Sequence, residues 1–172
     1  MAQDEGIFGR INKLMRSWAP PGIRPEVAHQ IIRKYVNVFA AVCPEQGKVC
    51  SLILPYSNTE MMNLFLEHVS EEFKNYFIIM QLDKAAWHTS DKLKLPENIR
   101  LIHQPARSPE LNPVEHLWEE IREKFFANCH FKTLDDVINL LCQAINSISD
   151  FPDKIRTLTY FTHLRITSSN AN

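Results

Sequence analysis

The spacing of apolar residues predicts strands in the first part of the chain, followed by a helix. Residues 29–43 are rich in β-branched and aromatic side chains, "PEQG" supplies a turn, and "KVCSLILPY" resumes the apolar pattern. This arrangement is typical of a β-hairpin. From residue 57 the period changes, because Met61, Leu64, Phe65 and Val69 recur at helical spacing, which predicts a helix.

The second part of the chain alternates strands with helices. Residues 76–83, "YFIIMQLD", form a short and continuously apolar run, as in strands that are buried on both faces. A short helix around residues 85–94, a strand near 99–103 and helices over roughly 113–127 and 134–148 follow. With a short first segment at residues 1–8, this order predicts an α/β domain with a mixed sheet of about five strands flanked by helices.

The composition of the chain is that of one globular domain. Its 172 residues are 45% hydrophobic and 23% charged, which allows a sizeable buried core. The apolar runs are too short to span a bilayer and the N-terminus lacks the layout of a signal peptide, so we expect a soluble, intracellular protein. The cysteines show neither CxxC nor Cys/His ligand spacing, which predicts reduced thiols rather than disulfides or a zinc site. They are Cys43, Cys50, Cys129 and Cys142.

The net charge of -1 does not by itself predict a polyanionic partner, but the charges are unevenly distributed. Residues 10–34 contain six basic side chains and one acidic side chain, whereas residues 110–123 contain five glutamates and one arginine. The basic residues of the first segment are Arg10, Lys13, Arg16, Arg24, Arg33 and Lys34. A basic surface beside an acidic pocket is compatible with an enzyme that holds phosphates and binds cations.

The stretch "NPVE" begins the last but one predicted helix and places a carboxylate on its first turn. Asn112 is a favourable N-cap, Pro113 suits the first helical position, and Glu115 falls at the third, which is the spacing of a capping box. One interpretation of Glu115 is therefore a purely structural cap. The alternative is a metal ligand, because Glu115 lies at the edge of the apolar stripe and can face along the sheet surface.

Asp83 ends the apolar run of residues 76–83, and Asp4 lies in the first short segment. An aspartate after a strand is often a turn initiator, but open α/β sheets also carry their active sites at the carboxyl ends of strands. If Asp4, Asp83 and Glu115 lie together, their charges repel unless divalent cations bind between them. Hard oxygen ligands suit Mg²⁺ or Mn²⁺, and a pair of such ions about 3.5–4 Å apart catalyses phosphodiester displacement. This hypothesis describes a nuclease or a strand-transferring enzyme.

Three segments resemble a known family. "LDKAAWHTS" and "QPARSPELNPVEHLWEEIREKF" are similar to motifs of bacterial insertion-sequence transposases related to the mariner superfamily, and "DEGIFGRINKLMRSWAPPGIRP" is similar to the segment of their first aspartate. The resemblance extends from Asp4 to about Ile148. It implies a ribonuclease H-like fold with an Asp-Asp-Glu triad of Asp4, Asp83 and Glu115, which would bind two Mg²⁺ or Mn²⁺ ions per active site.

The resemblance further implies a DNA transposase that hydrolyses phosphodiester bonds at element ends and transfers the strands to target DNA. Its partners would be terminal inverted repeats, target DNA and a second copy of the chain in a homodimeric synaptic complex, at the nucleoid in a bacterial cytoplasm. Residues 1–150 would be the catalytic domain and residues 151–172 a C-terminal extension and tail. Relatives carry a helix-turn-helix region, and only three residues precede Asp4, so we expect a truncated first strand and a separately encoded N-terminal DNA-binding segment.

The candidate DNA contacts are basic residues and one histidine, namely Arg10, Lys13, Arg16, Arg24, His88 and Arg107. A solvated basic surface and a structural histidine at a helix start are the alternatives for these positions, and Trp118 is expected in the core. Two other functions remain open. The chain can be an inactive remnant that acts at most as a DNA-binding or interaction module, or it can be another ribonuclease H-like nuclease, such as a junction resolvase.

Overall fold

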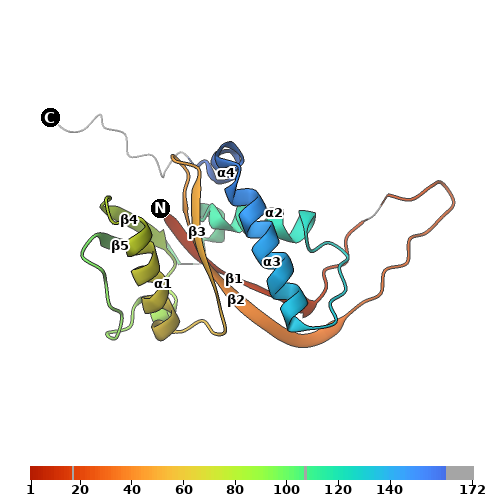
Figure 1. Ribbon diagram of the computed structural model, residues 1–172, viewed down its shortest axis with the longest axis horizontal. Helices are drawn as coiled ribbons and strands as arrows, with labels where there is room; N and C mark the ends of the chain where they lie inside the picture. Colours follow the sequence, from red (N-terminus) through yellow and green to blue (C-terminus); the bar gives the residue numbers. More distant parts are fainter. Residues whose placement is uncertain (17, 107, 162–172) are drawn as a thin grey trace.

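A five-stranded sheet forms the centre of the protein in the computed structural model, which describes residues 1–16, 18–106 and 108–161 (Figure 1). Its strands are β1 (Ala2–Ile11), β2 (Ile31–Cys43), β3 (Lys48–Leu54), β4 (Ile78–Leu82) and β5 (Ile99–His103). They lie in the order β3-β2-β1-β4-β5. The first three strands pair antiparallel, whereas β4 runs parallel to both β1 and β5. The predicted mixed sheet of about five strands is therefore confirmed.

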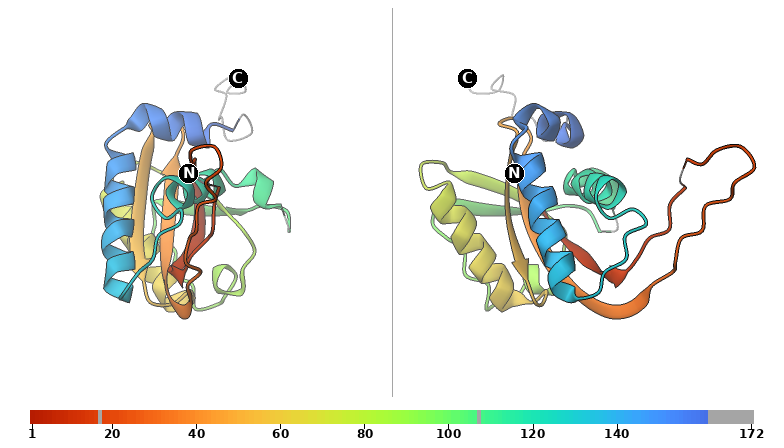
Figure 2. Two further views of the ribbon diagram at one scale, coloured as in Figure 1. Left: turned by 90° about the vertical axis from the view of Figure 1, so that its right-hand side faces the viewer. Right: turned by 45° about the vertical axis from the view of Figure 1, so that its right-hand side comes forward.

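Helices cover both faces of the sheet (Figures 1 and 2). Helix α1 (Thr59–Glu72) lies on one face, and α2 (Val114–Lys124), α3 (Leu134–Ser149) and α4 (Pro152–Thr159) lie on the other. Because successive side chains of a strand point to opposite faces, β2 contributes to both cores. Phe39 packs in the core under α1, and Val38 belongs to the same core as Trp118 of α2. None of the helices in the described residues is long and apolar enough to span a lipid bilayer.

The first strand is longer than the sequence predicts. It pairs with β2 from Ala2 to Ile11, so Asp4 lies near the beginning of a long strand rather than at the end of a short one. Glycines and charged residues after Asp4 hide the alternation of buried and exposed positions. One of these glycines is required by packing, because a Cβ atom on Gly6 would lie 2.9 Å from Cδ2 of Trp118.

Between β1 and β2 the chain projects away from the sheet as an arm (residues 12–16 and 18–30; Figures 1 and 2). Polar side chains fix its base to the loop before α3. Gln30 donates Nε2 to the carbonyl of Phe131 at 2.7 Å and accepts the N–H of Phe131 at 3.0 Å, while its own N–H donates to Oδ1 of Asn12 at 2.8 Å. Farther out, the indole of Trp18 is fully exposed.

Two helical elements differ from the predictions. Residues 85–94 contain only the 3₁₀ turn Ala86–His88, because Asn63 of α1 binds the backbone of Lys92 and Lys94 and keeps the rest of the segment open. Helix α4 has no counterpart among the predicted elements. Its Ile155 is completely buried in the core that contains Trp118, so the C-terminal extension begins as part of this helical layer.

Candidate active site

The pairing of β1 with β4 brings Asp4 level with Asp83. Ala2 lies opposite Gln81 in this parallel pair, and Asp4 and Asp83 each follow two residues later, Asp83 immediately after the end of β4. Alternate residues of a strand share a face, so Asp4 lies on the same side as Ala2, whose side chain packs in the core under α2 and α3. The two predicted aspartates are therefore neighbours on the face that α2 covers.

The loop before α2 is tied to the same two strands. Gln81 of β4 donates Nε2 to the carbonyl of Leu111 at 3.0 Å, and the buried side chain of Asn112 donates Nδ2 to the carbonyl of Gln3 in β1 at 2.9 Å. These bonds fix the start of α2 against the strands that carry the aspartates. Glu115, on the first turn of α2, is thereby placed beside them.

The capping box predicted from "NPVE" is not formed. The backbone N–H of Asn112 donates to the carbonyl of Pro109 at 2.9 Å, and the side-chain oxygen of Asn112 accepts the N–H of Val114 at 3.2 Å. The N-cap position is Pro113, which makes no capping bond, and the side chain of Glu115 does not bond back to Asn112 as a capping box requires. Glu115 is thus half-buried on the first turn without acting as a cap, which favours the interpretation as a ligand.

Trp118, which follows Glu115 by about one helical turn, holds Asp4. Its indole Nε1 donates to Oδ2 of Asp4 at 2.9 Å, and the residue is 1% exposed. Burial raises the pKa of Asp4 from 3.8 to about 7; the Trp118 hydrogen bond opposes this shift, and the negative charges of Glu115 and Glu5 add to it. The carboxylates of Asp4 and Glu115 therefore repel one another in a partly buried environment, and a bound cation would relieve this repulsion.

We expect Asp4→Asn to stabilise the metal-free protein at neutral pH. A carboxyl group whose pKa is raised on folding contributes fully below its unfolded value of 3.8, and this contribution is lost as the pH rises to about 7. In EDTA at about pH 8, the Tm of Asp4→Asn should exceed that of the wild type by at least about 3 °C, since 1 kcal/mol corresponds to about 2–4 °C in a domain of this size. The difference should disappear near about pH 4. A lower Tm for the variant at the higher pH would contradict the expectation, and the exposed Asp91→Asn serves as control.

His88 orients Asp83 and links it to a second carboxylate. Its Nδ1 lies 2.8 Å from Oδ1 of Asp83, and its Nε2 lies 2.9 Å from Oε1 of Glu5. Burial lowers the pKa of His88, but the hydrogen bond to Glu5 and the charges of Glu5 and Asp83 outweigh it and raise the pKa above 6.5. Oδ1 of Asp83 also accepts the N–H of Ala85 at 2.9 Å. One oxygen of Asp83 is thus fixed by the protein, and its side chain remains 48% exposed.

The prediction that His88 contacts DNA is not supported by this geometry, because the residue is 2% exposed and both ring nitrogens face carboxylates. Glu5 is a site residue that the sequence prediction missed. Its side chain is 9% exposed, and its Oε1 also accepts bonds from Nε2 of Gln3 at 2.9 Å and Nε1 of Trp87 at 3.3 Å. The one sequence feature that points to Glu5 is its position next to Asp4, because its partners Trp87 and His88 lie on a distant segment.

The oxygen ligands of Asp4, Asp83 and Glu115 fit a hard divalent cation such as Mg²⁺ or Mn²⁺. In the described residues these three carboxylates do not offer ligand atoms that all lie within 4.8 Å of one another. Ligands that share one Mg²⁺ are at most about 4.2 Å apart, twice a bond of about 2.1 Å. A single ion therefore does not contact all three carboxylates in this conformation.

Three of the predicted DNA contacts lie on the arm. Lys13, Arg16 and Arg24 are all exposed there. Arg10 instead belongs to the end of β1, and its Nε donates to the carbonyl of Phe131 at 3.1 Å. Arg107 lies outside the described residues. The exposed cations of the arm remain a predicted surface for phosphates.

Residues 1–138 match the family described as DDE superfamily endonuclease. The chain is 42% identical over 128 residues to "Uncharacterized protein y4pE/y4sA" of Sinorhizobium fredii (strain NBRC 101917 / NGR234), a match that covers 72% of this chain and 93% of that protein. It is 29% identical over 100 residues to the Transposable element Tcb2 transposase of Caenorhabditis briggsae, covering 44% of this chain and 37% of that protein.

Solved structures of the Mos1 transposase share the fold. The Mos1 strand transfer complex matches with a TM-score of 0.63 and 18% sequence identity, covering 93% of this chain and 54% of that chain. A Mos1 mariner paired end complex with Mn matches with a TM-score of 0.61, 18% identity and coverage of 93% and 55%. This chain thus spans about half the length of these Mos1 chains. The likeness confirms the predicted ribonuclease H-like fold.

Proposed function

Given that the chain belongs to the family of DDE superfamily endonucleases, we propose that it is the catalytic domain of a DNA transposase. Water would attack a phosphodiester bond at the end of a mobile element and release a 3′-hydroxyl group. That hydroxyl group would then attack a phosphodiester bond of target DNA, so that one bond forms as another breaks. The matches to the Tcb2 and Mos1 transposases support this reaction, and the Sinorhizobium relative supports a bacterial host. Action on DNA would place the protein at the nucleoid of the bacterial cytoplasm.

The convergence of three carboxylates from three separate elements carries the proposal. Asp4 comes from β1, Asp83 follows β4, and Glu115 lies on the first turn of α2. All three side chains are partly accessible, and among the described residues an ion-pair contact with a basic side chain is present only for Asp83, to His88. Acidic residues at the centre of a fold are ordinarily paired with a basic side chain. A group of acids that repel one another beside the central strands is best explained by cation binding.

In this proposal Asp4 and Asp83 hold two ions, with Asp83 as the bridging residue, and Glu115 completes the second ion site. Bound Mg²⁺ or Mn²⁺ would supply the positive charge that activates the attacking oxygen and stabilises the leaving oxygen. The protein's part is orientation. Trp118 holds one oxygen of Asp4 and His88 holds one oxygen of Asp83, so both carboxylates are positioned before a ligand binds.

The partners in this proposal are terminal inverted repeats and target DNA, with a second copy of the chain to bring two ends together. A separately encoded N-terminal segment would supply recognition of the repeat. The catalytic domain proposed for residues 1–150 would be completed by α4, which shares its core.

The experiment is an assay of cleavage and joining on DNA that carries both ends of the element surrounding this coding sequence, with the upstream-encoded segment supplied. We expect Mg²⁺- or Mn²⁺-dependent cuts at the repeat boundaries and strand-transfer products. Cleavage of branched junctions or RNA–DNA hybrids without preference for the repeats would instead identify another ribonuclease H-like nuclease. No cleavage of any substrate, with the upstream segment present, would identify an inactive remnant.

The arm is the proposed surface for phosphates beyond the active site. Replacing Lys13, Arg16 and Arg24 together by alanine should weaken DNA binding and reduce its salt dependence, because each lost phosphate contact lowers the slope of log K against log [salt] by about 0.9. A slope reduced by about 2–3 in fluorescence anisotropy titrations is the expected result. The matched control replaces Lys74, Lys92 and Lys94, which are exposed on the side of α1. Equal losses in both triple variants would rule out a specific role for the arm.

A further inference from the structure

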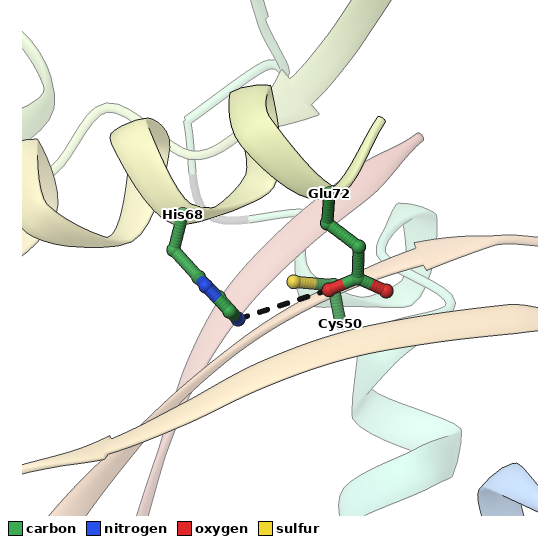
Figure 3. Close-up of side chains that lie close together, drawn as sticks. All are labelled: Cys50, His68 and Glu72. Atoms are coloured by element: carbon green, nitrogen blue, oxygen red, sulfur yellow. Dashed lines mark ion pairs between the residues drawn. The ribbon is translucent and has the colours of Figure 1, made fainter. Parts of the chain in front are cut away.

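A second group of potential metal ligands lies on the opposite side of the sheet from Glu115. Cys50 of β3 belongs to the core under α1, and His68 and Glu72 lie four residues apart on α1 itself. The ligand atoms of Cys50, His68 and Glu72 all lie within 4.8 Å of one another. In Figure 3 the three side chains turn toward one another between the helix and the strand. We infer that these residues form a binding site for a thiophilic divalent cation, of which Zn²⁺ is the best fit.

The choice of zinc follows from the donor set. A sulfur, an imidazole nitrogen and a carboxylate oxygen are all ordinary zinc ligands, whereas Mg²⁺ prefers oxygen ligands alone. Residues four apart on a helix lie on the same face, so His68 and Glu72 can bind one ion from a single turn. Three protein ligands leave a fourth position for water, as in zinc sites that remain open to solvent.

The surroundings favour a cation at this point. Glu72 is the last residue of α1, and helix C-termini attract positive charge through the unpaired carbonyl groups. Helix α1, which is described in full, carries no basic residue in its last turn to meet that need. The side chains of His68 and Glu72 are 43% and 45% exposed, so an ion can arrive from solvent and reach the buried sulfur between them and β3.

Without an ion, His68 and Glu72 make only a weak contact with each other. His68 Nε2 lies 3.7 Å from Oε2 of Glu72, which is too long for a strong hydrogen bond, and an exposed pair of this kind contributes little to stability. Burial raises the pKa of the Cys50 thiol, and the hydrogen bond and negative charge of Glu72 raise it further. Zinc binding would replace the thiol proton, which passes to solvent, by a sulfur–metal bond.

The consequence for the fold is a link between α1 and the edge strand β3. Cys50 is 2% exposed on that strand, and both other ligands come from the helix. Because the ion binds the folded protein and would lack a preformed site in the unfolded chain, it should raise the Tm. This site does not depend on the proposed transposase activity, since Asp4 faces the other side of the sheet.

The test is a titration of the whole chain, freed of metal by a chelator, with CoCl₂ and then ZnCl₂. Cobalt should produce the near-ultraviolet absorption of a thiolate–cobalt bond at one equivalent, and zinc should displace it and raise the Tm. Cys50→Ser and His68→Ala should remove the absorption and weaken zinc binding by at least about tenfold, because even groups that merely orient a ligand contribute about 10–100-fold. His68→Ala changes an exposed side chain and so tests the site without disturbing the core.

The controls are Cys142→Ser and His130→Ala, which remove an exposed thiol and an exposed imidazole elsewhere, and Asp83→Ala, which removes a proposed catalytic ligand. All three should show the same thiolate–cobalt absorption as the wild type. The inference is overturned if wild-type protein shows no thiolate–cobalt absorption, if the absorption survives Cys50→Ser, or if any control variant abolishes it.

Discussion

Replacing Asp83 by alanine is expected to abolish metal-dependent cleavage and joining of element-end DNA, with a loss of at least about 1,000-fold in rate. Asp83 follows the end of β4 and lies level with Asp4. Its partly exposed carboxylate is accessible to the metal ions that it is proposed to bridge. Its side chain is 48% exposed, so the substitution leaves no internal cavity. Rates measured with excess Mg²⁺ or Mn²⁺, together with the heat of metal binding, should both show the loss.

The exposed Asp91→Ala, eight residues farther along the chain, is the matched control and should cleave like the wild type. A circular dichroism spectrum and a Tm within about 3 °C of the wild type would show that Asp83→Ala is folded. Undiminished cleavage by a folded Asp83→Ala protein would remove this residue from the proposed metal-binding triad.

Replacing His88 by alanine should reduce cleavage by about 10–100-fold, as expected for a group that orients a metal ligand. It should also lower the Tm, because the carboxylate of Glu5, whose side chain is 9% exposed, would lose its 2.9 Å contact with the imidazole. Asp83 would keep the bond from Ala85 but lose the 2.8 Å contact that fixes its rotation. The variant would thus keep all three proposed metal ligands, but the orientation of the Asp83 carboxylate would be less restricted.

Measurements of metal affinity distinguish a positioning role of His88 from a purely structural role. At a temperature well below the Tm, a purely structural role for His88 leaves Mg²⁺ binding and cleavage unchanged in the folded variant. A positioning role weakens both, and the cleavage rate recovers in part at high metal concentration. His130→Ala, at an exposed position, should behave like the wild type in each measurement.

The elements of the fold that the sequence predicts are those whose apolar residues form a recognisable pattern within the element itself. Helix α1 follows from the helical spacing of apolar residues, and strand β4 follows from a short, continuously apolar run. The length of β1 could not be predicted, because Gly6 and Gly9 interrupt the apolar alternation for reasons of packing against Trp118 and Tyr35. Residues 85–94 have helix-like composition, but contacts with Asn63 on a distant helix decide their conformation.

The same distinction applies to the site. Asp83 and Glu115 stand in a recognisable motif, and the structure places them with Asp4, while their catalytic roles remain predictions. Glu5 and the indole of Trp118 act through partners more than eighty residues away in sequence, so no local pattern could have indicated them. Cys50 lacks the usual ligand spacing for the same reason, since the turn between β3 and α1 brings its partners close.

The pairing of β1 with β4 is short compared with that of its neighbours. β1 is matched to β2 over nearly its whole length, but in the described part of the chain Ala2 and Gln81 form the one register pair between β1 and β4. Asp4 and Asp83 therefore stand on opposite sides of the shortest strand pairing in the described sheet. The hydrogen-bonded chain from Asp83 through His88 to Glu5 crosses this junction, beside the bonds that join Met1 to Ile79 and Gln81 and the bond from Trp87 to Glu5. The spacing of the two aspartates therefore depends on side-chain contacts as well as on the strand pairing.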